Sequence, residues 1–496
     1  MTDIARPSTG AERPFDTLRA SPSNSRGELV EPRGVDRSRL PEPGPARTFV
    51  FPAIRKSTLD NGLGVWTVYH PQVPVVSLML LVRRGSAADP NGKEGLAAIT
   101  ADMLDEGSGD RSAIEIHEAL AQLGAQFDTD IGSDAIVVST TALSRFTDRV
   151  LALMADVVVR PALRDADFAR VRQLRLHRLT QLRDIPSAVA DRAFLKLLYG
   201  THPYGHAPIG TETALRELTA DDVRAFHAGA IRPSASTLVA VGDCAHDEIV
   251  RFAASAFGDW AADRHADGIE SLDERLAFEP GESLAAALPS RLAIVDRPGA
   301  PQSELRIGHV GVPRSTPDYH ALLVANAILG GQFVSRINLN LREDKGFTYG
   351  ARTAFEFRRM AGPFVLQVGV QTAATAAAIR ESLQELSDIR GERPASAEEL
   401  ALGIAALTRG YARNFETADQ IARGVMQLAL YDLADDYFAT FVPAVEAVTC
   451  DDVSRVMRHH LDPNRLITLI VGDAGAIGDV GSLPLGAPVT LPPDSF

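Results

Sequence analysis

Histidines four residues apart can share a metal ion when both project from one face of a helix. His202 and His206 have that spacing, but Pro203 and Gly205 stand between them and disfavour a helix there. The other candidates are adjacent or isolated, as surface and packing histidines usually are: His117, His177, His227, His459 and His460. Histidine spacing therefore gives no strong candidate for a metal site.

Motifs for other kinds of chemistry are missing as well. Cys244 and Cys450 are far apart and belong to no C-x-x-C or Cys/His spacing, which argues against a disulfide framework and a structural zinc site. The sequence contains no nucleophile elbow and no phosphate-binding glycine loop. The function of the chain has to be sought in longer sequence patterns.

The composition is that of a folded protein with several domains. The 496 residues exceed one ordinary core, and 45% of them are hydrophobic and 23% charged. A net charge of -14 and a pI near 5.4 argue against nucleic acid or an anionic membrane as a partner. No apolar run approaches the roughly 18 to 20 residues of a membrane span, and the N-terminus lacks the apolar segment of a secretory signal. We therefore expect a cytoplasmic protein.

Changes in composition and hydrophobic pattern along the sequence divide the chain into five parts. Residues 1–48 are rich in Pro, Ser, Gly, Arg and Glu without a hydrophobic period, so we expect a disordered extension. Two folded halves are expected at 49–264 and 291–475, joined by a polar linker at 265–290. Residues 476–496 are expected to form an irregular tail.

An internal repeat relates the two halves. Thr219-Ala-Asp-Asp-Val223 recurs as Thr449-Cys-Asp-Asp-Val453, and Pro233 with Gly242-Asp243 recurs as Pro463 with Gly472-Asp473. All of these pairs share one offset of 230 residues, and an apolar strand is expected before each Gly-Asp. A constant offset over such a stretch indicates a tandem duplication.

The elements that would position any site are the same in both halves. We expect an apolar strand, an apolar helix, a second helix and an alternating strand; the clearest segments are Val75–Val82, Leu96–Leu104 and Ala135–Thr141, then Leu305–Val310, Tyr319–Leu329 and Phe364–Gln371. The alternation in the last strand of each series favours half-buried antiparallel strands over a doubly wound parallel sheet. We predict an α+β fold with two homologous halves, each an antiparallel sheet with helices.

Several segments resemble the pitrilysin/insulinase family of zinc metallopeptidases. In the first half these are Leu59-Asp-Asn-Gly-Leu63 and the block His202-Pro-Tyr-Gly205 with Gly210, Leu218-Thr219 and Asp222. In the second half the most specific stretch runs from Gly330 to Gly350, and the match extends over nearly all of residues 50–475. The resemblance implies a peptidase-like protein with two homologous α+β halves.

The zinc motif of that family has been lost from this sequence. The family uses H-x-x-E-H on a helix, where two His residues bind the metal and the Glu acts as base. Aligned on Gly95 and Met103, this chain has other residues at those three positions: Ala98, Ala101 and Asp102. The third ligand, a Glu on a later helix, falls near Arg178. Alkyl groups donate no lone pair and an arginine repels Zn²⁺, so we expect no zinc in this chain.

Two residues of the second half match the family in type and spacing. They are Arg342 and Tyr349, and Gly346 is expected to end the helix that carries Arg342. The resemblance implies that both side chains face the zinc of another half, where they would hold a peptide carbonyl and its oxyanion. Taken alone, they could equally be a surface arginine at a helix C-terminus and an edge-strand aromatic.

The resemblance implies a subunit that is inactive alone and supplies Arg342 and Tyr349 to a homologous zinc-bearing peptidase subunit that hydrolyses peptides. The expected partners are that subunit and a peptide, with the zinc held by the partner. One alternative is a non-catalytic scaffold or binding homologue in a larger complex. Another is a stand-alone peptidase with a displaced metal site.

Overall fold

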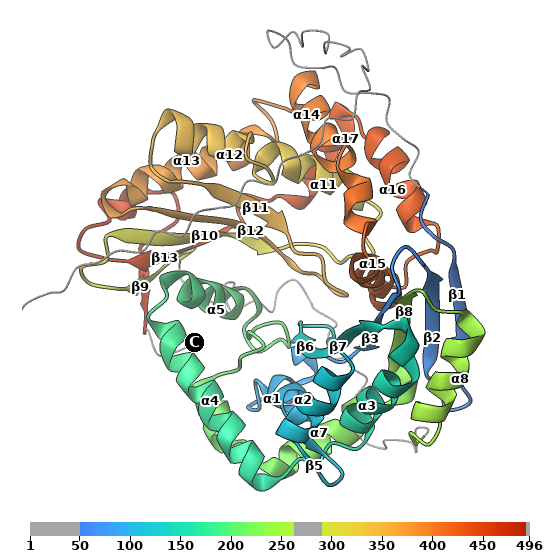
Figure 1. Cartoon of the computed structure of the whole chain (residues 1–496). Helices are drawn as coiled ribbons and strands as arrows, with labels where there is room; N and C mark the ends of the chain where they lie inside the picture. The colour runs from blue at the N-terminus through green and yellow to red at the C-terminus, as the bar shows by residue number, and fades with distance from the viewer. Residues whose placement is uncertain (1–49, 262–289, 493–496) are drawn as a thin grey trace, which may run out of the picture. The chain divides into compact units, whose positions relative to one another are not determined.

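The computed structural model describes residues 50–261 and 290–492, which form two halves with one six-stranded sheet each (Figure 1). The first sheet has the order β1-β2-β8-β3-β7-β6, with bounds Ile54–Thr58, Gly64–Tyr69, Ser236–Gly242, Val75–Val82, Ile136–Leu143 and Gln126–Ile131. A short hairpin of β4 (Gly107–Ser108) and β5 (Arg111–Ser112) stands outside this sheet.

Apart from one edge strand, β1 in the first sheet and β14 in the second, the second sheet repeats the strand order of the first. It runs β14-β9-β13-β10-β12-β11, with bounds Val489–Leu491, Leu292–Asp296, Ile467–Gly472, Gln302–Val310, Pro363–Gln371 and Ala351–Phe355. In both sheets the second and third strands are parallel, β2 with β8 and β9 with β13, and the strands that follow are antiparallel. The predicted tandem duplication is therefore confirmed at the level of the fold.

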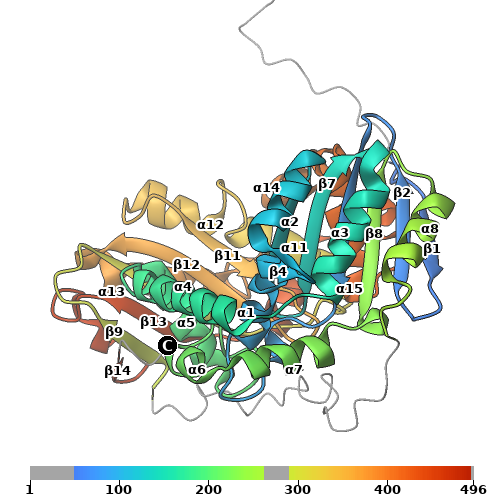
Figure 2. The ribbon, with the colours of Figure 1, turned by 60° about the horizontal axis from the view of Figure 1, so that its bottom comes forward.

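Helices cover both sheets. In the first half they are α1 (Leu96–Asp102), α2 (Ala113–Gln122), α3 (Thr147–Val159), α4 (Asp165–Arg183), α5 (Pro186–Tyr199), α6 (Glu212–Glu217), α7 (Ala220–Ala230) and α8 (His246–Phe257). In the second half they are α11 (Tyr319–Leu329), α12 (Arg336–Asn338), α13 (Thr375–Asp388), α14 (Ala397–Thr408), α15 (Ala418–Tyr431), α16 (Tyr437–Glu446) and α17 (Cys450–His460). Figure 2 shows α3 and α8 along one side of the first sheet, where they contact β7 and β2.

One helix of each half packs on the sheet of the other half. α5 contacts β10 and β13, and α15 contacts β3 and β8. The apolar side chains of α5 at these contacts include Val189, Ala193 and Leu197, and those of α15 include Ile421 and Val425. This exchange covers the second face of each sheet and joins the two halves through buried apolar surface.

The burial of both faces of β3 explains why its sequence is apolar along its whole length. Leu78 and Leu80 belong to the helix-covered core of the first half, whereas Met79 and Leu81 pack with α15. A strand buried on both faces must be apolar along its length, as Val75–Val82 is. The alternation expected for half-buried strands is found in β7. β12 is buried over most of its length, because its Val365 also packs in the cluster that contains α5.

The predicted elements are present with small shifts at their ends. β3 and α11 have the predicted bounds, and β10 begins at Gln302. The helix expected at Leu96–Leu104 is divided into α1 and the 3-10 turn η2 (Leu104–Glu106). The sheets were predicted to be antiparallel, but three neighbouring pairs are parallel: β2 with β8, β13 with β9, and β14 with β9.

The irregular tail expected at 476–496 is ordered in part. Val489–Leu491 forms β14, which pairs in parallel with β9 at the edge of the second sheet. Leu483 and Leu485 are buried in the core of the same half. The sequence does not predict this strand, because its three residues pair with a strand that is distant in the sequence. The extension at 1–48 and the linker, apart from Ser290, lie outside the described residues. None of the helices within 50–261 and 290–492 has the length and apolarity needed to cross a membrane.

Candidate functional site

The helix that should carry a zinc motif is packed with small side chains. α1 follows Gly95, whose left-handed backbone lets the chain enter the helix, and Ala98 and Ala101 are buried at 0% and 1% exposure. Asp102 ends the helix with a side chain that is 44% exposed. Two of the three positions therefore offer only methyl groups in a packed core.

An arginine on α4 neutralises the remaining acid. Arg175 Nε donates to Asp102 Oδ2 at 2.6 Å, and the Arg175 side chain is 10% exposed. Arg178, at the position predicted for the third ligand, lies one turn further along α4 and is exposed. Asp102, Arg175 and Arg178 all line one open depression of about 450 Å³. The structure thus places Asp102 and Arg178 around one depression, with Arg175 paired to Asp102 between them.

Two further acids of this depression, Asp105 and Glu106, have basic neighbours. Burial raises the pKa of Asp105, which the charge of His117 opposes, and burial raises the pKa of Glu106, which Arg170 opposes. His117 Nε2 lies 3.1 Å from Asp105 Oδ2, and Arg170 forms an ion pair with Glu106. Each of these two carboxylates is therefore engaged by a basic side chain within the fold.

The residues present do not fit the zinc ion that the sequence motif would hold. Zinc needs at least three lone-pair donors converging at about 2.0–2.3 Å. Here two positions are alkyl, the third is an aspartate paired with Arg175, and Arg178 adds a positive charge. Across 50–261 and 290–492, no three His, Cys, Asp or Glu side chains are grouped so that they could hold a metal ion.

His202 and His206, which are spaced like metal ligands on a helix, instead form hydrogen bonds within the first half. His206 Nε2 lies 3.1 Å from both Asp89 Oδ2 and the Ser86 carbonyl oxygen. His202 Nδ1 accepts a hydrogen bond from the Tyr204 backbone N–H at 3.1 Å. The segment between them forms turns rather than a helix, as Pro203 and Gly205 predict.

Arg342 lies on an unusual helical segment. α12 continues into the π-helical segment η5 (Leu339–Asp344), where the Lys345 N–H donates to the Asn340 carbonyl at 3.0 Å. Gly346 follows in the left-handed conformation, so the helix ends where the sequence predicts. Short π-helical segments often occur at functional sites because they change the direction of a side chain.

The guanidinium of Arg342 is held by its surroundings. Its Cζ lies 3.9 Å from the ring centroid of Phe333, and its Nη1 lies 3.4 Å from Glu343 Oε1. Nη1 is buried and makes no hydrogen bond with the described residues. The arginine is therefore oriented by the Phe333 ring and by its ion pair with Glu343, and its side chain is 29% exposed.

Tyr349 projects from a loop that is fixed on both sides. Thr348 Oγ1 donates to the Gly369 carbonyl at 2.7 Å, and Asn338 bonds both backbone groups of Ala351, with its Nδ2 to the carbonyl at 2.8 Å and its Oδ1 to the N–H at 2.9 Å. Tyr349 itself is 94% exposed. The loop backbone is anchored while the phenol remains available to another molecule.

Arg342 and Tyr349 form no hydrogen bond or ring contact with each other in the part of the chain that the structure describes. An open depression of about 500 Å³ beside their segment is lined by Phe333, Gly350 and Arg352 among others, but by neither Arg342 nor Tyr349. Sequence reasoning missed Arg175, Phe333 and Asn338. Arg175 could have been found from its spacing of three residues before Arg178, which places both on one face of a helix.

Two models of a single peptidase family match successive parts of the chain. Residues 64–212 match the model described as "Insulinase (Peptidase family M16)", and residues 217–407 match the one described as "Peptidase M16 inactive domain". The chain belongs to the M16 peptidase family. The boundary between the two models in this M16 chain falls before α7, so the second model also includes β8 of the first sheet.

Relatives of this M16 protein carry names that refer to zinc proteases. An uncharacterized zinc protease of Mycobacterium tuberculosis is 24% identical over 443 residues, which cover 88% of this chain and 97% of that protein. An uncharacterized zinc protease of Bacillus subtilis is 22% identical over 296 residues, or 60% of this chain and 68% of that protein.

Solved structures support the same fold. A crystal structure of a peptidase M16 inactive domain from Pseudomonas fluorescens has a TM-score of 0.76 at 24% identity and covers 85% of this chain and 98% of that chain. A protease from Helicobacter pylori has a TM-score of 0.78 at 18% identity and covers 85% of this chain and 99% of that chain. At these identities the similarity establishes the fold alone.

Proposed function

We propose that this chain is the zinc-less subunit of a two-subunit M16 peptidase. It holds the peptide through Arg342 and Tyr349, while a homologous zinc-bearing chain supplies the metal and hydrolyses the peptide bond. The observation that carries the proposal is the Asp102–Arg175 ion pair beside two buried alanines, because it occupies the place where a catalytic M16 chain needs its ligands.

The geometry around Arg342 supports the peptide-holding role. Arginine offers a rigid fork of donors, and here the guanidinium is oriented by the Phe333 ring while the side chain stays 29% exposed. Tyr349 offers a phenolic donor on an anchored loop. Donors held in advance at the place where charge develops on a carbonyl oxygen accelerate its attack, because they need no reorganisation.

Apolar surface near the pair also supports a bound partner. Four large apolar side chains within residues 333–349 are exposed: Phe333, Val334, Leu339 and Tyr349. Clustered exposed apolar residues typically mark a surface that binds another molecule. An extended peptide or the partner subunit would cover them in the assembled enzyme.

Reconstitution tests the proposal. The isolated chain should contain no stoichiometric zinc and should cleave no unstructured peptide. Coexpression with a homologous chain from the same genome that has an intact H-x-x-E-H motif should give a complex that cleaves peptides and loses activity with a chelator. One zinc per isolated chain, together with chelator-sensitive cleavage by that chain, would contradict the proposal. A complex whose partner is equally active alone would favour the scaffold alternative.

A further inference from the structure

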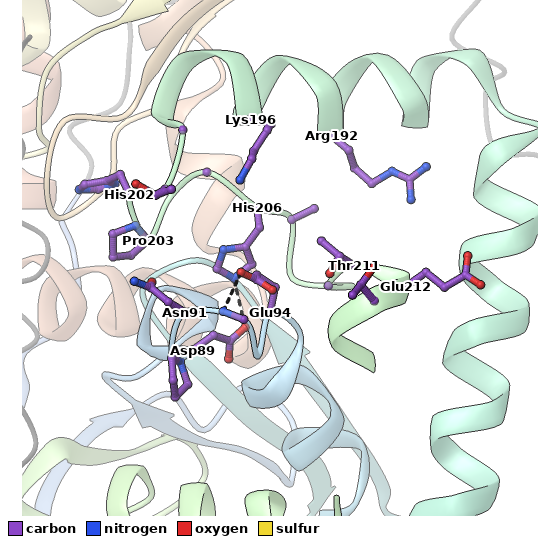
Figure 3. A pocket seen from close by; sticks show the side chains of 18 of the residues that line it. Asp89, Asn91, Glu94, Arg192, Lys196, His202, Pro203, His206, Thr211 and Glu212 are labelled. Carbon is purple, nitrogen blue, oxygen red and sulfur yellow. Dashed lines mark hydrogen bonds and ion pairs between the residues drawn. The ribbon is translucent and has the colours of Figure 1, made fainter. Parts of the chain in front are cut away.

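A second depression, of about 470 Å³, lies in the first half between α5, the 89–94 loop and the 200–213 segment (Figure 3). None of the residues assigned to the lost zinc site lines it, and neither Arg342 nor Tyr349 does. Its size is in the range of small-molecule sites. It is therefore separate from the site described above.

One side of α5 supplies two cations to this depression. The apolar side of the helix packs on the second sheet through residues such as Ala193 and Leu197. Arg192 and Lys196, one turn apart, project from the opposite side toward the segment that holds His206 and Thr211 (Figure 3). Their spacing of four residues places both charges on one helical face.

Arg192 is a buried cation that has no anionic partner within residues 50–261 and 290–492. The residue is only 8% exposed, and its Nε donates to the Ala188 carbonyl at 3.3 Å. Among the described residues, neither of its terminal nitrogens has an acceptor and no carboxylate forms an ion pair with it. Burial lowers the pKa of Arg192, and the nearby charge of Arg183 lowers it further. A buried charge in this state is costly unless an anion binds to it.

The carboxylates that line the same depression are already engaged. Asp89 is fully buried and accepts from the backbone N–H groups of Gly95 and Ala97 at 2.7 and 2.6 Å. Glu212 forms ion pairs with Arg183 and Arg216. Glu94 accepts from the Gly92 N–H at 3.1 Å. None of these contacts involves Arg192, so none of the carboxylates that line the depression pairs with it in the part of the chain that the structure describes.

We propose that this depression binds the oxyanion group of a small ligand, a carboxylate or a phosphate. Arg192 grips two oxygens with its planar fork, and Lys196 contributes a second positive charge from the same face of α5. Both groups are oxyanions that arginine binds through two parallel hydrogen bonds. The site does not depend on the proposed peptidase role, since it shares no residue with that machinery.

Calorimetric titration of the full chain tests this site with two probes, inorganic phosphate and citrate, at constant ionic strength. We expect saturable binding of one equivalent of at least one probe in the millimolar range or tighter. Binding of phosphate alone assigns a phosphate ligand, and binding of citrate alone assigns a carboxylate. If neither probe saturates, the proposal is wrong.

Variants locate the binding. Lys196→Gln and Arg192→Gln should each weaken binding by about tenfold or more, and Arg192→Lys should not restore it, because lysine lacks the planar fork. Arg251→Gln is the matched control, since that arginine lies on α8 with a 69% exposed side chain. Lys196 is only partly buried, so its variant tests the site even if the Arg192 variants fail to fold. Unchanged affinity in the folded Lys196→Gln chain would overturn the proposal.

Discussion

The Asp102–Arg175 ion pair should contribute measurably to the stability of the first half. The perturbation is a double-mutant cycle with Asp102→Asn and Arg175→Gln. Breaking a fully buried pair costs about 3–5 kcal/mol, and breaking an exposed pair costs about 0.2–1 kcal/mol. Arg175 is 10% exposed but Asp102 is 44% exposed, so solvent screens the pair in part. We expect a coupling energy of about 1–2 kcal/mol for a charged hydrogen bond in this position.

Differential scanning calorimetry of the four chains measures this coupling. In a unit of 150–250 residues, 1 kcal/mol shifts Tm by about 2–4 °C. The control is the same cycle on Arg55 and Asp247, whose side chains are 61% and 84% exposed and whose Nη2–Oδ1 distance is 3.0 Å. A coupling no larger than that of the control pair would refute the reasoning, because Asp102 would then be free to serve another function.

Two further predictions concern buried positions. Ala101→Glu restores a motif residue but places a carboxylate at a position that is 1% exposed. Calorimetry should therefore show that it lowers the free energy of unfolding by about 3 kcal/mol or more. The control Ala169→Glu, on the exposed side of α4, should change the free energy of unfolding little. Burial lowers the pKa of His309 from 6.5 to about 4, so the unfolded chain binds more protons and stability should fall as the pH falls from about 6.5 toward 4. His309→Phe should remove up to about 3 kcal/mol of this acid-dependent loss of stability, and His459→Gln, at an exposed position, should not. If the wild-type chain and both variants show the same pH dependence of Tm, the prediction for His309 is wrong.

The repeat and the apolar runs predict much of the fold. β3 and α11 were placed correctly because their sequences are apolar over the whole element and are bounded by turn residues. The duplication is visible because the segments that begin at Thr219 and Thr449 keep a constant offset, and each begins a helix with a capping box. The apolar runs and the repeated helix caps are both recognised from residues that are close together in the sequence.

What the sequence could not give depends on contacts between distant residues. The exchange of α5 and α15 between the halves is set by which sheet each helix covers, and helical periodicity carries no such information. β14 was missed because three residues pair with β9, nearly two hundred positions away. At the candidate site, the sequence of the segment predicts Arg342 and Tyr349. It does not predict that Arg342 lies over the Phe333 ring or that Asn338 anchors the loop, because both contacts depend on how the loop folds.

The most direct test of the proposed function is the turnover of the assembled two-subunit complex with Tyr349→Phe in this chain. The substitution removes one hydroxyl from a side chain that is 94% exposed, so folding and assembly should survive, as size-exclusion chromatography would verify. Tyr69→Phe is the matched control, because Tyr69 is 63% exposed on β2, far along the sequence from the Arg342–Tyr349 segment. Loss of a donor to a developing oxyanion costs about 10²- to 10³-fold in kcat. We predict a decrease of that size for Tyr349→Phe and none for Tyr69→Phe; an intact complex in which Tyr349→Phe retains wild-type turnover would contradict the account.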